Sequence, residues 1–135
     1  MPILKLPAKI ENLDNFRQMI AGIAAENGFS DERIQEIVMA AEEALINIFN
    51  YAYPETAGSV TVDCRFEDPD RFFIEISDQG APFDLLSVPE PDLSASVSAR
   101  QVGGLGVFFI RKLMDEVQYR REGACNVLTF INKRR

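Results

Sequence analysis

Two stretches near the beginning of the chain carry apolar residues at helical spacing. The first follows Asn12, a residue type that favours helix N-caps, and ends at Asn27-Gly28, a typical helix stop. The second follows Ser30, another N-cap residue, and must end before Pro54 because proline cannot continue a helix. We therefore expect two consecutive helices. Their apolar positions are Leu13, Phe16, Ile20, Ile23 and Ala24 in the first and Ile34, Ile37, Val38, Ala41, Leu45 and Ile48 in the second.

Strict alternation of apolar and polar residues follows the second helix. Every second side chain is apolar over residues 60–66, and after the turn sequence Asp68-Pro69-Asp70 a second strand carries Phe72, Ile74 and Ile76 on one face. Such alternation predicts an antiparallel hairpin with one buried face. A short strand over residues 3–6 is expected to precede both helices.

The chain changes character between about residue 85 and residue 102, where two prolines and four serines interrupt the apolar residues. A loop of this length is usually tied to function. A third helix with one apolar stripe then starts at the glycines of residues 103–106, and a hairpin of residues 117–121 and 126–132 closes the chain. This order predicts a single α+β domain over residues 1–135, a two-layer sandwich whose mostly antiparallel sheet is covered on one face by three helices.

Composition narrows the range of functions. The 135 residues include 14 basic and 21 acidic ones, and a net charge of −7 argues against general nucleic-acid binding, which needs a basic surface. The chain contains no histidine, which excludes Ser-His-Asp or Cys-His catalysis, imidazole metal ligands and autophosphorylation on histidine within this chain.

The two cysteines and the N-terminus indicate the compartment. Cys64 and Cys125 are too isolated for a zinc site or a disulfide framework, and Cys64 falls on the apolar phase of its strand, which predicts a buried free thiol. No stretch is apolar enough to span a membrane, and the first residues lack the layout of a signal peptide. We expect a cytoplasmic protein.

Glu43 and Asn47 are four residues apart on the second predicted helix, so both lie on one face of it. Taken alone, the simpler interpretation is a side-chain hydrogen bond between them or a surface pair. The functional interpretation is that Asn47 offers its carbonyl oxygen to Mg²⁺, which prefers oxygen ligands. Glu43 would then orient or deprotonate a nucleophile.

Asp78 continues the apolar phase of the strand that carries Ile74 and Ile76, so its carboxylate should point toward the helices. A buried acid needs hydrogen bonds. It either caps the following turn, which is common, or accepts a hydrogen bond from an exocyclic amine such as that of adenine. Gly80 would let the backbone turn and approach the base closely, and Pro82 and Phe83 would wall the pocket.

The segment Gly103-Gly104-Leu105-Gly106 directly precedes the third predicted helix. Backbone N–H groups at a helix N-terminus suit phosphate, and glycines let phosphate approach. For a glycine cluster on its own, the simpler interpretation, a flexible hinge between loop and helix, is favoured. It is not a P-loop, because no Gly-Lys-Ser/Thr follows, and it is not a dinucleotide-binding fingerprint, because Phe109 stands where a third glycine is needed.

The order of these motifs is more specific than any one of them. A helix with Glu-x-x-x-Asn, a strand that ends in Asp-x-Gly and a loop that leads into Gly-x-Gly at a helix start resembles the GHKL (Bergerat-fold) ATPase superfamily over nearly the whole chain. Within it, the small size and the segments around residues 42–47, 78–84 and 103–107 look most like the bacterial anti-sigma serine kinases. The expected fold is therefore the histidine kinase-like ATPase fold.

The resemblance implies ATP and Mg²⁺ as cofactors. Asn47 would ligate Mg²⁺, Asp78 would bind the adenine amine, Gly80 would shape the adenine pocket, and Gly104 and Gly106 would hold the phosphates. The residues expected to contact the nucleotide are Asn47, Asp78, Gly80, Phe83, Arg100, Gly103, Gly104, Leu105, Gly106 and Val107.

The resemblance also implies catalysis and partners. Glu43 would be the general base that activates a serine or threonine of an anti-sigma antagonist, and residues 85–102 would form a lid over the phosphates, with Arg100 near the γ-phosphate. A sigma factor and a second copy of the chain are further expected partners. The alternatives are a nucleotide-gated binding module with negligible kinase activity and a detached histidine-kinase catalytic domain.

Two departures concern the adenine pocket. Many family members carry His-Gly after the Asn helix, where this chain has Asn50-Tyr51-Ala52-Tyr53. The glycine and threonine common near the last strand are replaced around Asn126. The fine structure of the pocket is therefore left open by the sequence.

Overall fold

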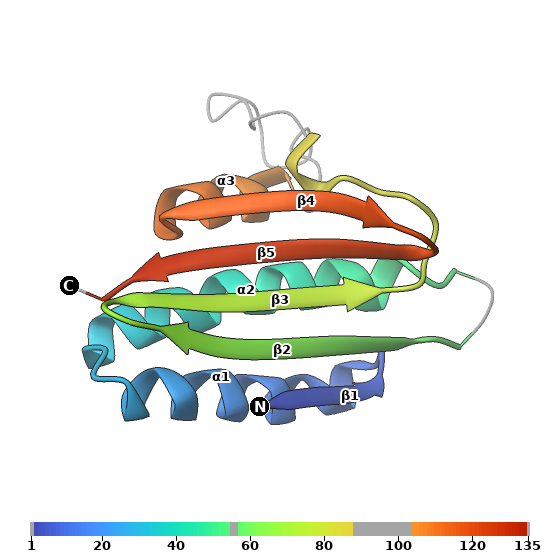
Figure 1. Ribbon diagram of the computed structural model, residues 1–135. Coiled ribbons are helices and arrows are strands. Elements are labelled where there is room, and N and C mark those ends of the chain that lie inside the picture. Colours follow the sequence, from blue (N-terminus) through green and yellow to red (C-terminus); the bar gives the residue numbers. More distant parts are fainter. Residues whose placement is uncertain (1, 55–56, 88–103, 135) are drawn as a thin grey trace.

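Five antiparallel strands form one sheet in the computed structural model, which describes residues 2–54, 57–87 and 104–134 (Figure 1). In spatial order the strands are β1 (Ile3–Pro7), β2 (Ser59–Glu67), β3 (Arg71–Asp78), β5 (Cys125–Lys133) and β4 (Glu116–Glu122). Each predicted strand is present, and β3 and β5 occupy the middle of the sheet, where each has a partner on both sides.

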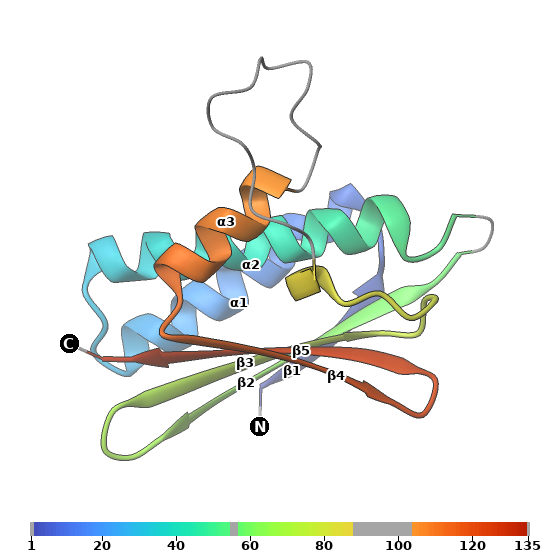
Figure 2. The same cartoon turned by 90° about the horizontal axis from the view of Figure 1, so that it is seen from above.

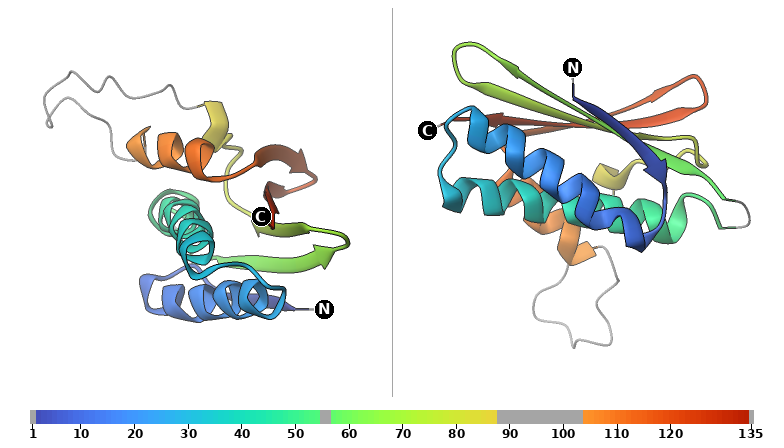
Figure 3. Two further views of the ribbon diagram at one scale, coloured as in Figure 1. Left: turned by 90° about the vertical axis from the view of Figure 1, so that its left-hand side faces the viewer. Right: turned by 90° about the horizontal axis from the view of Figure 1, so that it is seen from below.

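The helices α1 (Leu13–Glu26), α2 (Asp31–Tyr51) and α3 (Gly104–Leu113) all cover one face of this sheet (Figure 2). Helix α2 lies between the other two (Figure 3). The predicted α+β sandwich is thereby confirmed, with its helices on one face only. No helix in the described part of the chain is long and apolar enough to cross a bilayer.

The two predicted helix caps differ in outcome. Ser30 caps α2 as expected, because its hydroxyl oxygen accepts a hydrogen bond from the backbone N–H of Arg33 at 3.1 Å. Asn12 precedes α1, but its side chain does not cap the helix. Its amide instead donates to the backbone carbonyl of Pro7 at 2.8 Å, which ties the start of α1 to the end of β1.

The hydrophobic core lies between the helices and the sheet, and its strand residues follow the predicted phase. Val62 pairs with Ile76, and Ile76 pairs with Leu128, so the buried side chains form rows across the sheet. The largest fully buried side chains of the core are Phe16, Ile20, Ile37, Leu45, Ile74, Ile76, Phe72, Ile110 and Phe130. The next row of buried positions, at the end of β3, contains two polar residues. Asp78 of β3 pairs with Val60 of β2 on one side and with Asn126 of β5 on the other.

A buried arginine joins the C-terminal end of α3 to the start of α2. The guanidinium of Arg33 donates to the backbone carbonyl of Leu113, to the carboxylate of Asp115 at 3.0 Å and to the side-chain oxygen of Asn132 at 3.3 Å. Its side chain is only 10% exposed, so these charge-assisted bonds are shielded from water. The end of α3 is therefore fixed to both α2 and the sheet.

Cys64 and Cys125 are both free thiols, as predicted, but they differ in reactivity. Cys64 is fully buried, and burial raises the pKa of its thiol to about 12, whereas Cys125 is partly exposed at the start of β5. Since the thiolate is the reactive species, Cys64 stays protonated and unreactive at pH 8.

We expect a thiol-reactive chromophore to label one thiol of the native protein at pH 8 and both in denaturant. Rapid labelling of two thiols in the native protein would contradict the buried position of Cys64.

Candidate functional site

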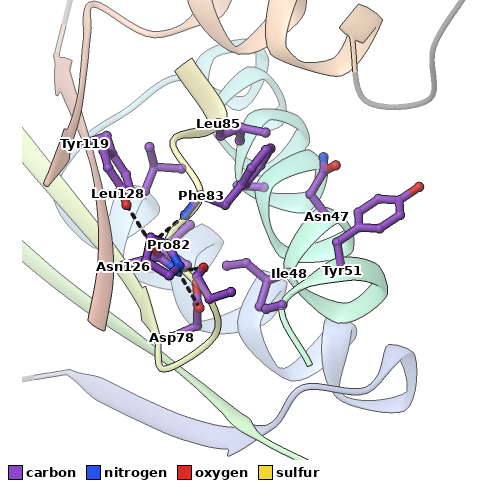
Figure 4. Close-up of a pocket in the computed structure, with 14 residues that line it drawn as sticks. Asn47, Ile48, Tyr51, Asp78, Pro82, Phe83, Leu85, Tyr119, Asn126 and Leu128 are labelled. Atoms are coloured by element: carbon purple, nitrogen blue, oxygen red, sulfur yellow. Dashed lines mark hydrogen bonds between the residues drawn. The ribbon is translucent and has the colours of Figure 1, made fainter. Parts of the chain in front are cut away.

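A pocket of about 280 Å³ lies between the C-terminal half of α2, the ends of β3 and β5, and the segment that follows β3 (Figure 4). Its lining is predominantly apolar, with a few polar groups, the composition typical of a small-molecule site. The residues that line it are Ala44, Asn47, Ile48, Tyr51, Ala52, Ile76, Asp78, Ala81, Pro82, Phe83, Leu85, Tyr119, Asn126 and Leu128. Three predicted site residues, Asn47, Asp78 and Phe83, therefore meet at one cavity.

Asp78 is the acidic group of the pocket, and it is only 6% exposed. One carboxylate oxygen, Oδ1, accepts hydrogen bonds from the backbone N–H of Gly80 at 2.8 Å and from the side-chain amide of Asn126 at 3.0 Å. Among the described residues no donor reaches the other oxygen, Oδ2. The turn-capping interpretation of Asp78 is thus confirmed, and its second oxygen is free to accept a hydrogen bond from a ligand amine, which stays a prediction.

Asn126 organises the rim of the pocket, and the sequence analysis did not identify it as a site residue. Its amide nitrogen donates to Asp78 and to the carbonyl of Ala81 at 2.9 Å. Its oxygen accepts from the backbone N–H of Phe83 at 3.1 Å and from the hydroxyl of Tyr119 at 2.6 Å (Figure 4). These contacts saturate the amide, so Asn126 holds the rim in place. One signal was available, since this amide lies on the apolar phase of β5.

Gly80 allows a close approach, but to a helix. A Cβ atom there would lie 2.5 Å from the backbone oxygen of Ala52 at the end of α2. Its φ is not in the left-handed region, which among the described glycines is adopted by Gly28 and Gly123. The expectation that Gly80 lets the backbone turn is therefore wrong, because the turn does not need glycine's conformational freedom; what excludes a side chain is contact with Ala52 after α2. The expected close approach to a base stays a prediction. Arg121 also donates to the Gly80 carbonyl at 2.8 Å.

Aromatic side chains stand at the mouth of the pocket. Phe83, on the segment after β3, is 51% exposed, and Tyr51, at the end of α2, is 55% exposed (Figure 4). Leu85 is buried and begins a one-turn 3-10 helix, Leu85–Ser87. Exposed aromatic faces beside an apolar cavity suit the stacking of a flat ring.

Asn47 lies at the rim of the pocket, one helical turn after Glu43. Its amide nitrogen donates to the backbone carbonyl of Glu43 at 2.8 Å, so the expected bond between the two side chains is not formed. The side-chain oxygen of Asn47 meets no donor within the described ranges. A single such oxygen fits Mg²⁺, which takes its remaining ligands from waters and phosphates. No group of three or more histidine, cysteine or acidic residues in the described ranges forms an alternative metal site.

Glu43 lies beside the first turn of α3. A Cβ atom on Gly106 would stand 2.3 Å from the carboxylate oxygen Oε2 of Glu43, so the two residues are in direct contact. Helix α3 begins at Gly104, as the glycine segment predicted, and Val107 is buried in the core. The backbone N–H groups of this turn therefore lie close to Glu43, on the face of α2 that also carries Asn47.

Several predicted residues are not placed. Arg100, Gly103 and lid residues 88–102 lie outside the described residues, and of the predicted lid only residues 85–87 are described. Leu105 lies in the first turn of α3. The predicted roles of all these residues stay predictions.

Comparison with known proteins gives a consistent family. The model of the histidine kinase-like ATPase domain matches residues 6–132. The chain is 36% identical to the serine-protein kinase RsbW of Listeria monocytogenes over 97% of its own length and 87% of that protein. It is 33% identical to the protein of the same name from Bacillus cereus, over 93% of this chain and 80% of that one.

Two solved structures share the fold. The RsbU and RsbW domains of Rv1364c from Mycobacterium tuberculosis match with a TM-score of 0.66 at 16% identity, over 99% of this chain and 33% of that chain. The blue-light activated histidine kinase EL346 of Erythrobacter litoralis matches with a TM-score of 0.61 at 16% identity, over 90% of this chain and 41% of that chain. At this identity the likeness concerns the fold alone.

The central position of Asn126 can be tested by its stability effect. Asn126→Ala removes one of the two donors to the buried Asp78 carboxylate and the partners of the part-buried Ala81 carbonyl and Phe83 N–H, and we expect a loss of about 2–3 kcal/mol of unfolding free energy. Tyr119→Phe removes only one bond to the same amide and should lower the free energy by about 1 kcal/mol. Urea unfolding measures both. Equal effects of the two substitutions would contradict the organising role of Asn126.

Proposed function

The chain belongs to the histidine kinase-like ATPase domain family and, within it, to the serine-protein kinases of the RsbW type; from this premise we propose that it transfers the γ-phosphoryl group of Mg-ATP to a serine or threonine of an anti-sigma antagonist protein. The observation that carries the proposal is the oxygen Oδ2 of buried Asp78, which meets no donor in the described part of the chain and lines an apolar pocket.

The adenine base fits the requirements of this pocket. Its exocyclic amine is a donor for Asp78 Oδ2, and its flat ring matches the apolar walls and the exposed ring of Phe83. Asn126 and Gly80 act indirectly, because they fix Asp78 and the rim segment without offering a contact of their own. The pocket therefore selects the base.

The phosphates would extend from the base toward the start of α3. Gly104 and Gly106 supply backbone N–H groups at the positive end of a helix, where phosphate is stabilised. Mg²⁺ would neutralise phosphate charge in this chemistry, and the Asn47 oxygen would be the protein ligand that holds it. Arg100, Gly103 and Leu105 would complete the proposed nucleotide site under the proposed lid of residues 85–102; Val107, whose side chain is buried in the core, could contribute only its backbone.

Glu43 is the proposed general base. It lies one helical turn from the Mg²⁺ ligand and beside the first turn of α3, so it is next to the proposed position of the γ-phosphate. The target hydroxyl gives its proton to Glu43 while its oxygen bonds to the γ-phosphorus. The bond from phosphorus to the β–γ bridging oxygen breaks, and its electron pair leaves with ADP.

The partners follow from the proposed reaction. The proposed substrate is a small regulator with an exposed serine or threonine. A sigma factor is the second proposed partner, bound when the protein is not acting on this substrate. Both classes act in the cytoplasm, where we place this activity. Pull-down from the native host with ATP and then with ADP identifies these partners and provides the substrate for the assay.

Glu43→Gln tests the base. It keeps the size of the side chain but cannot accept the proton, so we expect phosphoryl transfer to the recovered antagonist to fall by about 10²-fold or more. The affinity for ATP should change by about twofold at most, because Glu43 does not line the base pocket. Radioactive phosphate incorporation and calorimetry measure the two quantities.

Glu42→Gln is the matched control. It makes the same change one residue earlier on α2, but the Glu42 carboxylate pairs with Arg17 of α1 at 2.6 Å and faces away from the site. This variant should transfer normally. If Glu43→Gln transfers as fast as Glu42→Gln, Glu43 is not the base. If the unaltered protein binds ATP but transfers nothing to any recovered partner, the alternative of a nucleotide-gated binding module replaces the kinase.

A further inference from the structure

Gly106 leaves no room for a side chain, and the atoms that fill its space belong to Glu43. A Cβ atom built on Gly106 would lie 2.3 Å from Oε2, 3.1 Å from the carboxyl carbon and 3.5 Å from Cγ of Glu43. The nearest atoms to a Cβ on Gly80, by contrast, include the backbone of α2. The neighbour of Gly106 is therefore the flexible end of the Glu43 side chain and not backbone.

The carboxylate of Glu43 has no other fixed support. No hydrogen bond or ion pair holds it among the described residues, and the amide of Asn47 bonds to the backbone oxygen of Glu43 only. Packing against the first turn of α3 is therefore the contact that sets the position of the carboxylate. A group that relies on packing moves when the packing surface changes.

Helix α3 cannot easily move away to relieve a clash. Its C-terminal end is attached to α2 and the sheet by Arg33, through the Leu113 carbonyl and Asp115. The helices run antiparallel, with Gly106 against Glu43 at one end and Leu113 against Arg33 at the other. A side chain at position 106 therefore displaces the flexible carboxylate more readily than it displaces the helix.

We propose that Gly106 is a positioning residue for Glu43: its missing side chain provides the space that the carboxylate occupies, and the first turn of α3 thereby sets where the base stands. This inference rests on the proposed role of Glu43 as the base. It adds to the proposed contact of the Gly106 N–H with phosphate, because one residue then aligns the nucleotide through its backbone and the base through its lack of a side chain. Phosphate position and base position are linked at a single residue.

Gly106→Ala is the test. Alanine suits a helix better than glycine, and the clash falls on a flexible side-chain end, so the unfolding free energy should not fall. We expect kcat for phosphoryl transfer to drop by about tenfold or more, with the KM for ATP changed by about twofold at most. In a Glu43→Asp background, whose shorter side chain clears the new Cβ atom, Gly106→Ala should lower kcat no further.

Gly22→Ala is the matched control. Gly22 also lies in a helix, α1, and a Cβ atom there would meet nothing within 4 Å. This variant should transfer normally. The inference is overturned if Gly106→Ala transfers like Gly22→Ala, if it loses ATP affinity in step with kcat, or if its effect is the same in the Glu43→Asp background.

A second readout is independent of transfer. The amide NMR signal of Gly106 in the ligand-free protein should shift in Glu43→Gln and stay in place in Glu42→Gln, because Glu43 contacts Gly106 whereas Glu42 pairs with Arg17. A protein that transfers no phosphate but shows this shift would refute the proposed function and leave the contact standing. A protein that transfers phosphate but shows no shift would refute the contact alone.

Discussion

A carboxylate buried at the end of a central strand must be hydrogen-bonded, and the form of the pocket follows from the way Asp78 meets this requirement. Its partners, the Gly80 N–H and the Asn126 amide, occupy one oxygen. Asn126 then uses its remaining capacity on Ala81, Phe83 and Tyr119, so the segment after β3 is fastened to β4 and β5. The second oxygen is left to a ligand, and the wall around it is already in place.

Helix α2 provides the common frame for recognition and chemistry. Its last turns line the base pocket, with Asn47 at the rim. Glu43 lies one turn before Asn47 in the same helix, against the start of α3. Because Arg33 fixes the far end of α3 to the same helix, the glycine turn and Glu43 keep a constant relation. Base recognition, phosphate binding and proton transfer are thus arranged along one rigid element, which suits a reaction that depends on positioning.

Much of this architecture could be predicted from residue periodicity. The alternation in β2 and β3 predicted the buried face and the inward direction of Asp78, and Ser30 predicted the start of α2. The features that could not be predicted depend on contacts between distant segments. Asn126 meets Asp78 only through the register of β3 against β5. A side chain is excluded at Gly80 by contact with Ala52 and at Gly106 by contact with Glu43, both distant in sequence. Local sequence also predicted that the Asn12 side chain caps α1, which is wrong because its bond to the Pro7 carbonyl competes with helix capping.

The central claim is that the free oxygen of Asp78 recognises an adenine amine, and nucleotide selectivity tests it most directly. Calorimetry with ATP and GTP, on the unaltered protein in Mg²⁺, compares an amine with a carbonyl at the same ring position. Guanine would set its carbonyl oxygen against the carboxylate oxygen, two acceptors facing each other, so we predict that ATP binds about 100-fold or more tightly than GTP. Equal affinity for the two nucleotides would contradict the assignment of Asp78 and with it the proposed orientation of the nucleotide.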